Sequence, residues 1–160
     1  MGDQITEDFK ETHIPQQHWV EGIPFPRVLV AGPAFSQTSS TQPPAQAVGE
    51  AIRRHKEWVE SLLHSSGAVL LRGFPIHTAH DFNEVVVAFG YEELPYVGGT
   101  APRTNVLGRV FTSNESPPDQ PIPFHHEMAQ VGICFTFQVS GIHLINLENN
   151  VTMIQNASSG

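Results

Sequence analysis

The sequence is poor in cysteine, in basic residues and in long apolar runs. Its 160 residues hold one cysteine, Cys134, so neither an internal disulfide nor a four-thiolate zinc site can form. Lysine and arginine number 8 against 16 acidic residues, and the formal net charge is −8. Because nucleic-acid phosphates are bound by clustered cations, we expect no nucleic-acid partner. No stretch approaches the length of a membrane span and the N-terminus is polar, so we expect a soluble cytoplasmic protein with no membrane partner.

The clearest helix follows a polar connector at residues 36–46. Its apolar residues recur at spacings of three, four and seven and share one face: Val48, Ile52, Val59, Leu62 and Leu63. Gly67 is suited to a left-handed cap that ends the helix. The basic run "RRHK" at 53–56 lies among acidic residues of this helix, and we expect it to form a solvated face.

A second helix is predicted after Thr78, because Asp81 three residues later completes an N-cap signature. Gly90 ends it, and its apolar face consists of Phe82, Val85, Val86 and Phe89. Strands are predicted at 28–30, at 68–74 as a buried strand, at 104–114 with a break at Gly108, and at 124–131.

These elements divide the chain into three segments by composition. We expect a polar N-terminal segment at 1–22 and a mixed domain at 23–131. The tail at 132–160 has one charged residue and is rich in Ile, Asn and Phe. We expect this divergent tail to be poorly ordered.

The stretch "PIPFHHEMAQ" at 121–130 contains a candidate metal-binding pair, His125 and Glu127. Residues i and i+2 of a strand point to the same side, so an imidazole and a carboxylate could bind one ion there. His126 would then face away. A second His–x–acid pair, His55 and Glu57, lies in the predicted helix, where positions two apart diverge by about 200° and cannot chelate one metal. Spacing alone leaves a histidine pair without a ligand role as an alternative.

Several elements occur in an order that resembles a known family. They include "GAVLLRGFPIHTAHDFNEVVVAFG" at 67–90 and "YVGGTAPRTNVLGRVFTSNESPPDQPIPFHHEMAQ" at 96–130. Over about residues 20–131 the chain resembles the taurine dioxygenase-like (TauD/TfdA) superfamily, in its clavaminate synthase-like branch. The resemblance implies an α+β fold: the N-terminal part of a double-stranded β-helix (jelly roll) with two flanking helices. It also implies a dioxygenase that uses iron(II) and 2-oxoglutarate to oxidise a small-molecule substrate.

By this resemblance His125 and Glu127 are the first two iron ligands, and Arg103 and Thr104 lie where such proteins shape the substrate pocket. The family's third ligand is a histidine far downstream, followed by an arginine that binds 2-oxoglutarate. No lysine or arginine follows Arg109 here, and the later histidine, His143, is too close to the pair.

We therefore expect a truncated product, such as a retained intron beginning near codon 130 or a mis-predicted gene model. A spliced transcript that encodes this tail without interruption would contradict that expectation. Two alternatives stay open. One is a catalytically inactive truncated form or interaction protein, and the other is a zinc-binding module built on His125, His126 and Glu127. The sequence leaves the oligomeric state undecided.

Overall fold

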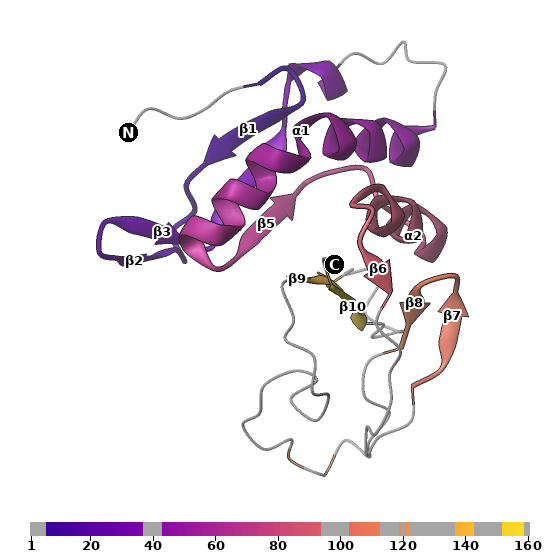
Figure 1. The fold of residues 1–160 in the computed structure, drawn as a ribbon. Coiled ribbons are helices and arrows are strands. Elements are labelled where there is room, and N and C mark those ends of the chain that lie inside the picture. Colours follow the sequence, from indigo (N-terminus) through magenta and orange to yellow (C-terminus); the bar gives the residue numbers. More distant parts are fainter. Residues whose placement is uncertain are drawn as a thin grey trace. The chain divides into compact units, whose positions relative to one another are not determined.

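A computed structural model describes residues 6–36, 43–93 and 103–112, positions 119 and 121, and the backbone of strands at 137–142 and 152–158. The fold is mixed α/β, with two α-helices and several small sheets in this part of the chain (Figure 1). The chain divides into two compact units, Met1–Ile76 and His77–Gly160, and each is described by itself.

A three-stranded sheet forms the centre of the first unit, with the order β1-β4-β5. β1 (Phe9–Thr12) runs antiparallel to β4 (Arg27–Ala31), and β4 runs parallel to β5 (Val69–Arg72). The chain between β1 and β4 forms a hairpin of β2 (His18–Val20) and β3 (Ile23–Phe25), visible beside β1 in Figure 1. A 3₁₀ turn, η1 (Pro33–Ser36), follows β4.

The connection from β4 to β5 is made by α1 (Pro44–Ser66), which confirms the first predicted helix. Its buried face includes Val48, Ile52, Val59 and Leu62, as the apolar spacing indicates. Gly67 caps the helix in the left-handed conformation, at φ 80°, and its N–H donates to the carbonyl of Leu63 at 2.7 Å. The glycine is suited to this position because a side chain would disfavour positive φ.

Aromatic rings fill the space between the sheet and α1. Phe9 of β1 is fully buried, and its ring centroid lies 5.6 Å from that of His55, 6.2 Å from that of Trp58 and 5.6 Å from that of Phe74. Phe35 continues the cluster by an edge-to-face contact with Phe74. The sequence reading predicts no strand at residues 1–22, yet β1 supplies the centre of this core.

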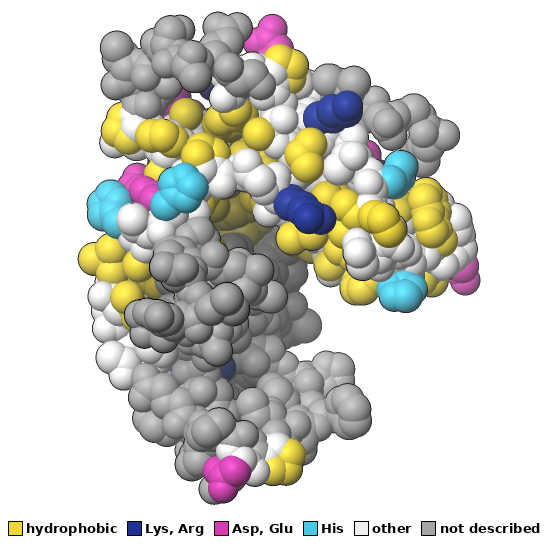
Figure 2. Space-filling model, turned by 180° about the vertical axis from the view of Figure 1, so that it is seen from behind, with side chains coloured by type: hydrophobic (Ala, Val, Ile, Leu, Met, Phe, Trp, Pro, Cys, Tyr) yellow, Lys and Arg dark blue, Asp and Glu magenta, His cyan; other side chains and the backbone are white. Residues whose placement is uncertain are grey.

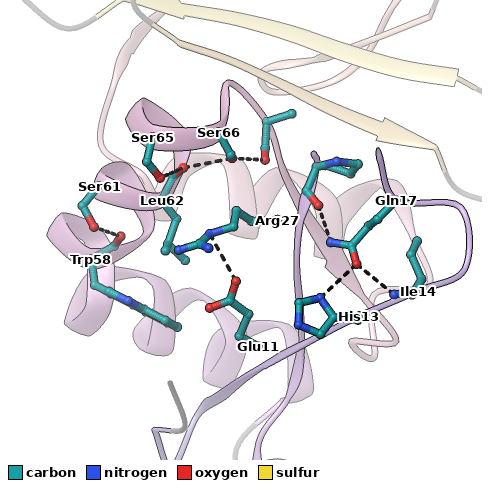
Figure 3. A network of polar contacts seen from close by, with 12 residues as sticks. Glu11, His13, Ile14, Gln17, Arg27, Trp58, Ser61, Leu62, Ser65 and Ser66 are labelled. Carbon is teal, nitrogen blue, oxygen red and sulfur yellow. Dashed lines mark hydrogen bonds and ion pairs between the residues drawn. The ribbon is translucent and has the colours of Figure 1, made fainter. Parts of the chain in front are cut away.

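β1 is hard to recognise because its second inward-facing residue is Glu11. That carboxylate forms an ion pair with the guanidinium of Arg27 on β4, with Nε and Oε1 3.1 Å apart and both side chains largely buried (Figure 3). A buried charge is tolerated where an opposite charge pairs with it.

Gln17 fixes the chain beyond β1. Its amide nitrogen donates to the carbonyl of Pro26 at 2.6 Å, and its carbonyl accepts from the N–H of Ile14 at 2.9 Å.

The prediction that residues 53–56 form a solvated face is wrong for His55 and holds for Arg53, which is exposed. His55 is 21% exposed, and its Nε2 lies 2.9 Å from Oδ2 of Asp8, a carboxylate that is itself 8% exposed. Arg54 Nη1 donates to the same oxygen. At His55 the helix has non-helical dihedrals, φ −112° and ψ 17°, so α1 is kinked where Asp8 holds it.

The prediction of a buried strand at 68–74 is wrong in its burial. β5 occupies Val69–Arg72, and alternate residues are exposed; Leu70 retains 38% of its accessible surface. β5 lies at the edge of the described sheet, and α1 covers one side of that sheet. A continuous apolar run therefore does not distinguish a strand covered on both faces from one covered on a single face.

The second unit begins with α2 (Ala79–Ala88), which confirms the second predicted helix. It continues through β6 (Glu92–Glu93), β7 (Asn105–Leu107) and β8 (Val110–Phe111). Two further strands, β9 (Phe137–Ile142) and β10 (Thr152–Ser158), pair antiparallel in a sheet of order β6-β10-β9. The sequence reading predicts neither of the last two strands.

A reciprocal capping box opens α2. The N–H of Asp81 donates to Oγ1 of Thr78 at 3.1 Å, and the N–H groups of His77 and Thr78 each donate to Oδ2 of Asp81 at 3.0 Å. Burial acts to raise the pKa of Asp81, but these hydrogen bonds and the nearby charge of His80 outweigh it and hold the pKa below its ordinary value. The ionised carboxylate is therefore favoured in the folded state.

We expect the stabilisation by Asp81 to be lost at acid pH. Because folding lowers this pKa, the contribution is fully present above the unfolded pKa, about 4, and disappears as the pH falls through the folded value. The variant Asp81→Asn should be less stable than the wild type by about 1 kcal/mol at pH 6 and should match it more closely at pH 3. Urea unfolding of both proteins at the two pH values measures this; an equal difference at both would contradict it.

Candidate functional site

The segment that leads toward the candidate metal pair is a short hairpin, β7–β8. The predicted strand at 104–114 is broken at Gly108, as expected, and the two halves fold back on each other. The base of the hairpin is closed by Thr104 and Thr112. The N–H of Thr104 donates to Oγ1 of Thr112 at 2.8 Å, and the N–H of Thr112 donates to the carbonyl of Thr104 at 2.9 Å.

Asn83 of α2 holds the turn of this hairpin. Its Oδ1 accepts a hydrogen bond from the N–H of Arg109 at 2.9 Å. Gly108 lies so close to Asn83 that a Cβ built on it would be 2.5 Å from Oδ1, and its φ of 52° also favours glycine. Arg109 Nη1 donates to the carbonyl of Tyr91 at 2.6 Å. The hairpin is thus fixed to α2 and to the residues that follow it.

The structure places the two predicted pocket residues at the start of this hairpin. Arg103 is half-buried and Thr104 is exposed. The backbone groups of Thr104 are paired with Thr112 and close the base of the hairpin. Whether Arg103 and Thr104 line a substrate pocket stays a prediction.

The candidate ligands His125 and Glu127 lie outside the described residues, as do His126 and the predicted strand at 124–131. Within the part of the chain that the structure describes, no group of three or more His, Cys, Asp or Glu side chains could hold a metal ion. In the same part, no helix is long and apolar enough to cross a membrane.

The sequence reading missed Asn83 as the residue that positions the hairpin. An asparagine inside an amphipathic helix has no distinctive local signature, because the partner it binds lies beyond Gly90. Gly108 does predict the bend, since a glycine within a strand pattern indicates a bend or a close backbone approach. Together the two residues specify the contact, but neither does so alone.

Comparison with known proteins gives a family match at residues 37–135, to the family described as taurine catabolism dioxygenase TauD, TfdA. The chain is 58% identical over 127 residues to the clavaminate synthase-like protein At3g21360 of Arabidopsis thaliana, covering 76% of this chain and 36% of that protein. It is 29% identical over 103 residues to the dapdiamide synthesis protein DdaC of Enterobacter agglomerans, covering 64% and 31%.

The chain therefore spans about a third of the length of these curated relatives. The family match covers more than half of the chain and includes both candidate metal ligands and both predicted pocket residues. The family match ends at residue 135, four residues beyond residue 131, where the sequence motifs placed the end of the resemblance. The chain belongs to the taurine catabolism dioxygenase TauD, TfdA family.

Proposed function

We propose that this chain carries part of the active site of an iron(II)- and 2-oxoglutarate-dependent dioxygenase, with His125 and Glu127 as two of the iron ligands. The observation that carries the proposal is the family match over 37–135, which includes the His–x–Glu pair in its expected order after the hairpin. The match to a clavaminate synthase-like relative over most of the chain supports it.

The donor set fits this metal. Non-haem iron(II) sites that activate dioxygen commonly take two histidines and one carboxylate on one face and leave the other positions open. His125 and Glu127 supply one nitrogen and one oxygen donor of that set. Bound iron with 2-oxoglutarate supplies the activation of dioxygen, while the chain's own residues hold and orient the reactants.

The remaining elements have supporting roles in this proposal. Arg103 and Thr104 precede the hairpin that Asn83 fixes, and the hairpin returns the chain to Thr104 at Thr112, ahead of the ligand pair in the sequence. Arg103 could bind a carboxylate of a small-molecule substrate through its guanidinium group. The sheets would belong to a double-stranded β-helix, which requires about eight strands in two layers.

We also propose that the chain alone turns over slowly. No lysine or arginine follows Arg109 in the sequence, and His143 is the one histidine after His126. The third histidine and the arginine that would bind 2-oxoglutarate therefore have no clear counterpart among these residues.

Metal binding tests the proposed ligands without requiring turnover. We expect the 160-residue chain to bind Fe(II), or Co(II) as a spectroscopic probe, with an affinity that falls about tenfold or more in His125→Ala and in Glu127→Ala. His126→Ala is the matched control, because on a strand its side chain would face away, and it should keep the wild-type affinity. Titration under anaerobic conditions measures all four proteins.

Three results would contradict the assignment. Equal metal affinity in His125→Ala and the wild type would exclude His125 as a ligand. Loss of affinity in His126→Ala together with retention of zinc through dialysis would favour the zinc module. Iron-dependent formation of succinate from 2-oxoglutarate that persists in His125→Ala would place the activity elsewhere.

A further inference from the structure

The β7–β8 hairpin is held to α2 by a polar side chain, that of Asn83. The buried residues of α2 are all apolar, whereas Asn83 is half-buried and binds the backbone of the hairpin turn. Its Oδ1 accepts from the N–H of Arg109 at 2.9 Å, and a Cβ built on Gly108 would lie 2.5 Å from the same oxygen. Both the length of this side chain and its acceptor atom therefore set where the turn lies.

Burial alone does not fix the hairpin. Val110 of β8 is fully buried, but all three residues of β7 are exposed, and Val106 and Leu107 retain 44% and 38% of their accessible surface. Figure 2 views the molecule from behind and shows hydrophobic and uncharged side chains on the surface at the left of that view, where the hairpin lies. A strand that buries so little surface depends on specific polar contacts for its position.

A second contact anchors the hairpin through the side chain of Arg109. Its Nη1 donates to the carbonyl of Tyr91 at 2.6 Å. Tyr91 is itself buried and stacked on Phe89, with ring centroids 5.8 Å apart, and Phe89 is the residue at which α2 ends. The backbone and the side chain of Arg109 are thus attached to α2 and to the segment that follows it. Two attachments restrict rotation of the hairpin as well as its translation.

Hydrogen bonds continue from the turn to the base of the hairpin. Asn105 Nδ2 donates to the carbonyl of Gly108 at 2.8 Å. At the base, the N–H of Thr104 donates to Oγ1 of Thr112, and the N–H of Thr112 donates to the carbonyl of Thr104. Arg103 directly precedes Thr104, is half-buried, and its Nε atom is buried. A displacement of the turn is therefore transmitted to Arg103 through contiguous contacts.

We propose that Asn83 is a positioning residue for substrate binding, because it sets the place of Arg103 through the β7–β8 hairpin. The inference rests on the proposed function, in which the guanidinium of Arg103 binds a carboxylate of the substrate. A guanidinium binds a carboxylate best through two parallel hydrogen bonds, so a displacement of about 1 Å weakens binding. The ligand class is a small organic molecule that carries a carboxylate.

Nuclear magnetic resonance of the full 160-residue chain tests the proposal, with propionate as the probe. The Nε–H of Arg103 gives a resonance that is assigned by its loss in Arg103→Lys. We expect propionate at constant ionic strength to shift this resonance in the wild type, and the dissociation constant to rise about tenfold in Asn83→Ala. The order parameter of the same N–H bond should fall from about 0.85 to below about 0.6, because the guanidinium is no longer held.

Two further variants separate positioning from general stability. Asn83→Asp keeps an acceptor oxygen for the N–H of Arg109 and should restore most of the affinity. Val85→Ala removes buried methyl groups from α2 without removing this hydrogen bond, so it should unfold more easily and still bind propionate like the wild type. If Asn83→Ala fails to fold by circular dichroism, Asn83→Gln, which moves the amide outward by one methylene, replaces it and should show the same loss.

Wild-type affinity and an unchanged order parameter in Asn83→Ala would overturn the proposal, and so would an equal loss of affinity in Val85→Ala. Binding by Asn83→Asp that is no better than by Asn83→Ala would also overturn it, because the hydrogen bond would not be the cause. A wild-type resonance that propionate does not shift would exclude Arg103 as the carboxylate site. These measurements contain no metal, so a failure of His125 and Glu127 as iron ligands appears only in the metal titration and is distinguished from a failure of this inference.

Discussion

Replacing Phe9 by alanine is expected to lower the free energy of unfolding of the first unit by about 3–5 kcal/mol. Phe9 is fully buried, and three aromatic rings of His55, Trp58 and Phe74 surround it. Removing the ring loses its transfer free energy and leaves a cavity that these side chains cannot fill without moving. Urea unfolding followed by Trp58 fluorescence, in a Trp19→Phe background, measures the change.

Phe25→Ala provides the control for that experiment. Phe25 belongs to the β2–β3 hairpin and is 43% exposed, so its removal should cost about 1 kcal/mol or less. If the two substitutions destabilise the protein equally, the core is not centred on Phe9. If Phe9→Ala costs less than 1 kcal/mol, β1 is not packed on α1 in solution.

Gly32→Ala is the second substitution with a large expected effect. A Cβ at this position would lie 2.5 Å from the carbonyl oxygen of Glu7 and 2.7 Å from the carbonyl carbon of Asp8, both backbone atoms. The N–H of Gly32 also donates to the carbonyl of Asp8 at 2.8 Å. The start of β1 would have to move, and overpacking of this kind costs about 1–3 kcal/mol or more.

The displacement should extend to α1, because Asp8 accepts hydrogen bonds from Arg54 and His55 at the kink. The comparison is Gly22→Ala, where nothing lies within 4 Å of the added Cβ and the cost comes from the positive φ of 81°, about 1 kcal/mol. Thermal unfolding of both variants separates steric overlap from backbone strain. A smaller loss of stability for Gly32→Ala than for Gly22→Ala would show that the close approach is absent.

Local patterns were sufficient to predict the helices. Val48, Ile52 and Val59 share a face in α1, Gly67 ends it, and Thr78 with Asp81 begins α2, all through interactions within a few residues. The strand over 28–30 was also predicted, because its three apolar residues follow prolines that exclude a helix.

β1 was not predictable in the same way. Its inward-facing Glu11 and the preceding Asp8 read as solvated acids, and they are buried because Arg27, Arg54 and His55 come to them from distant positions. A local pattern cannot reveal a charge that is neutralised by residues far along the chain. The contact with Asp8 also explains why the prediction of a solvated face at residues 53–56 is wrong for His55.

The candidate site shows a similar division. Residue chemistry and order point to His125 and Glu127, and the family match covers both. Their geometry stays a prediction, since both residues lie outside the described part of the chain. Asn83 and Gly108 fix the preceding hairpin by their contact. The two residues are 25 positions apart in the sequence, and local spacing patterns do not predict such a contact.

The parallel pairing of β4 and β5 has a consequence for synthesis on the ribosome. β4 emerges early and pairs with β1, but its other edge stays without a partner until the whole of α1 and then β5 have been made. During that interval the nascent chain exposes unpaired backbone groups and the apolar residues Val28 and Leu29, which invite association with other chains. Rapid formation of α1, which needs only local contacts, would shorten this exposure by drawing β5 into place as soon as it is translated.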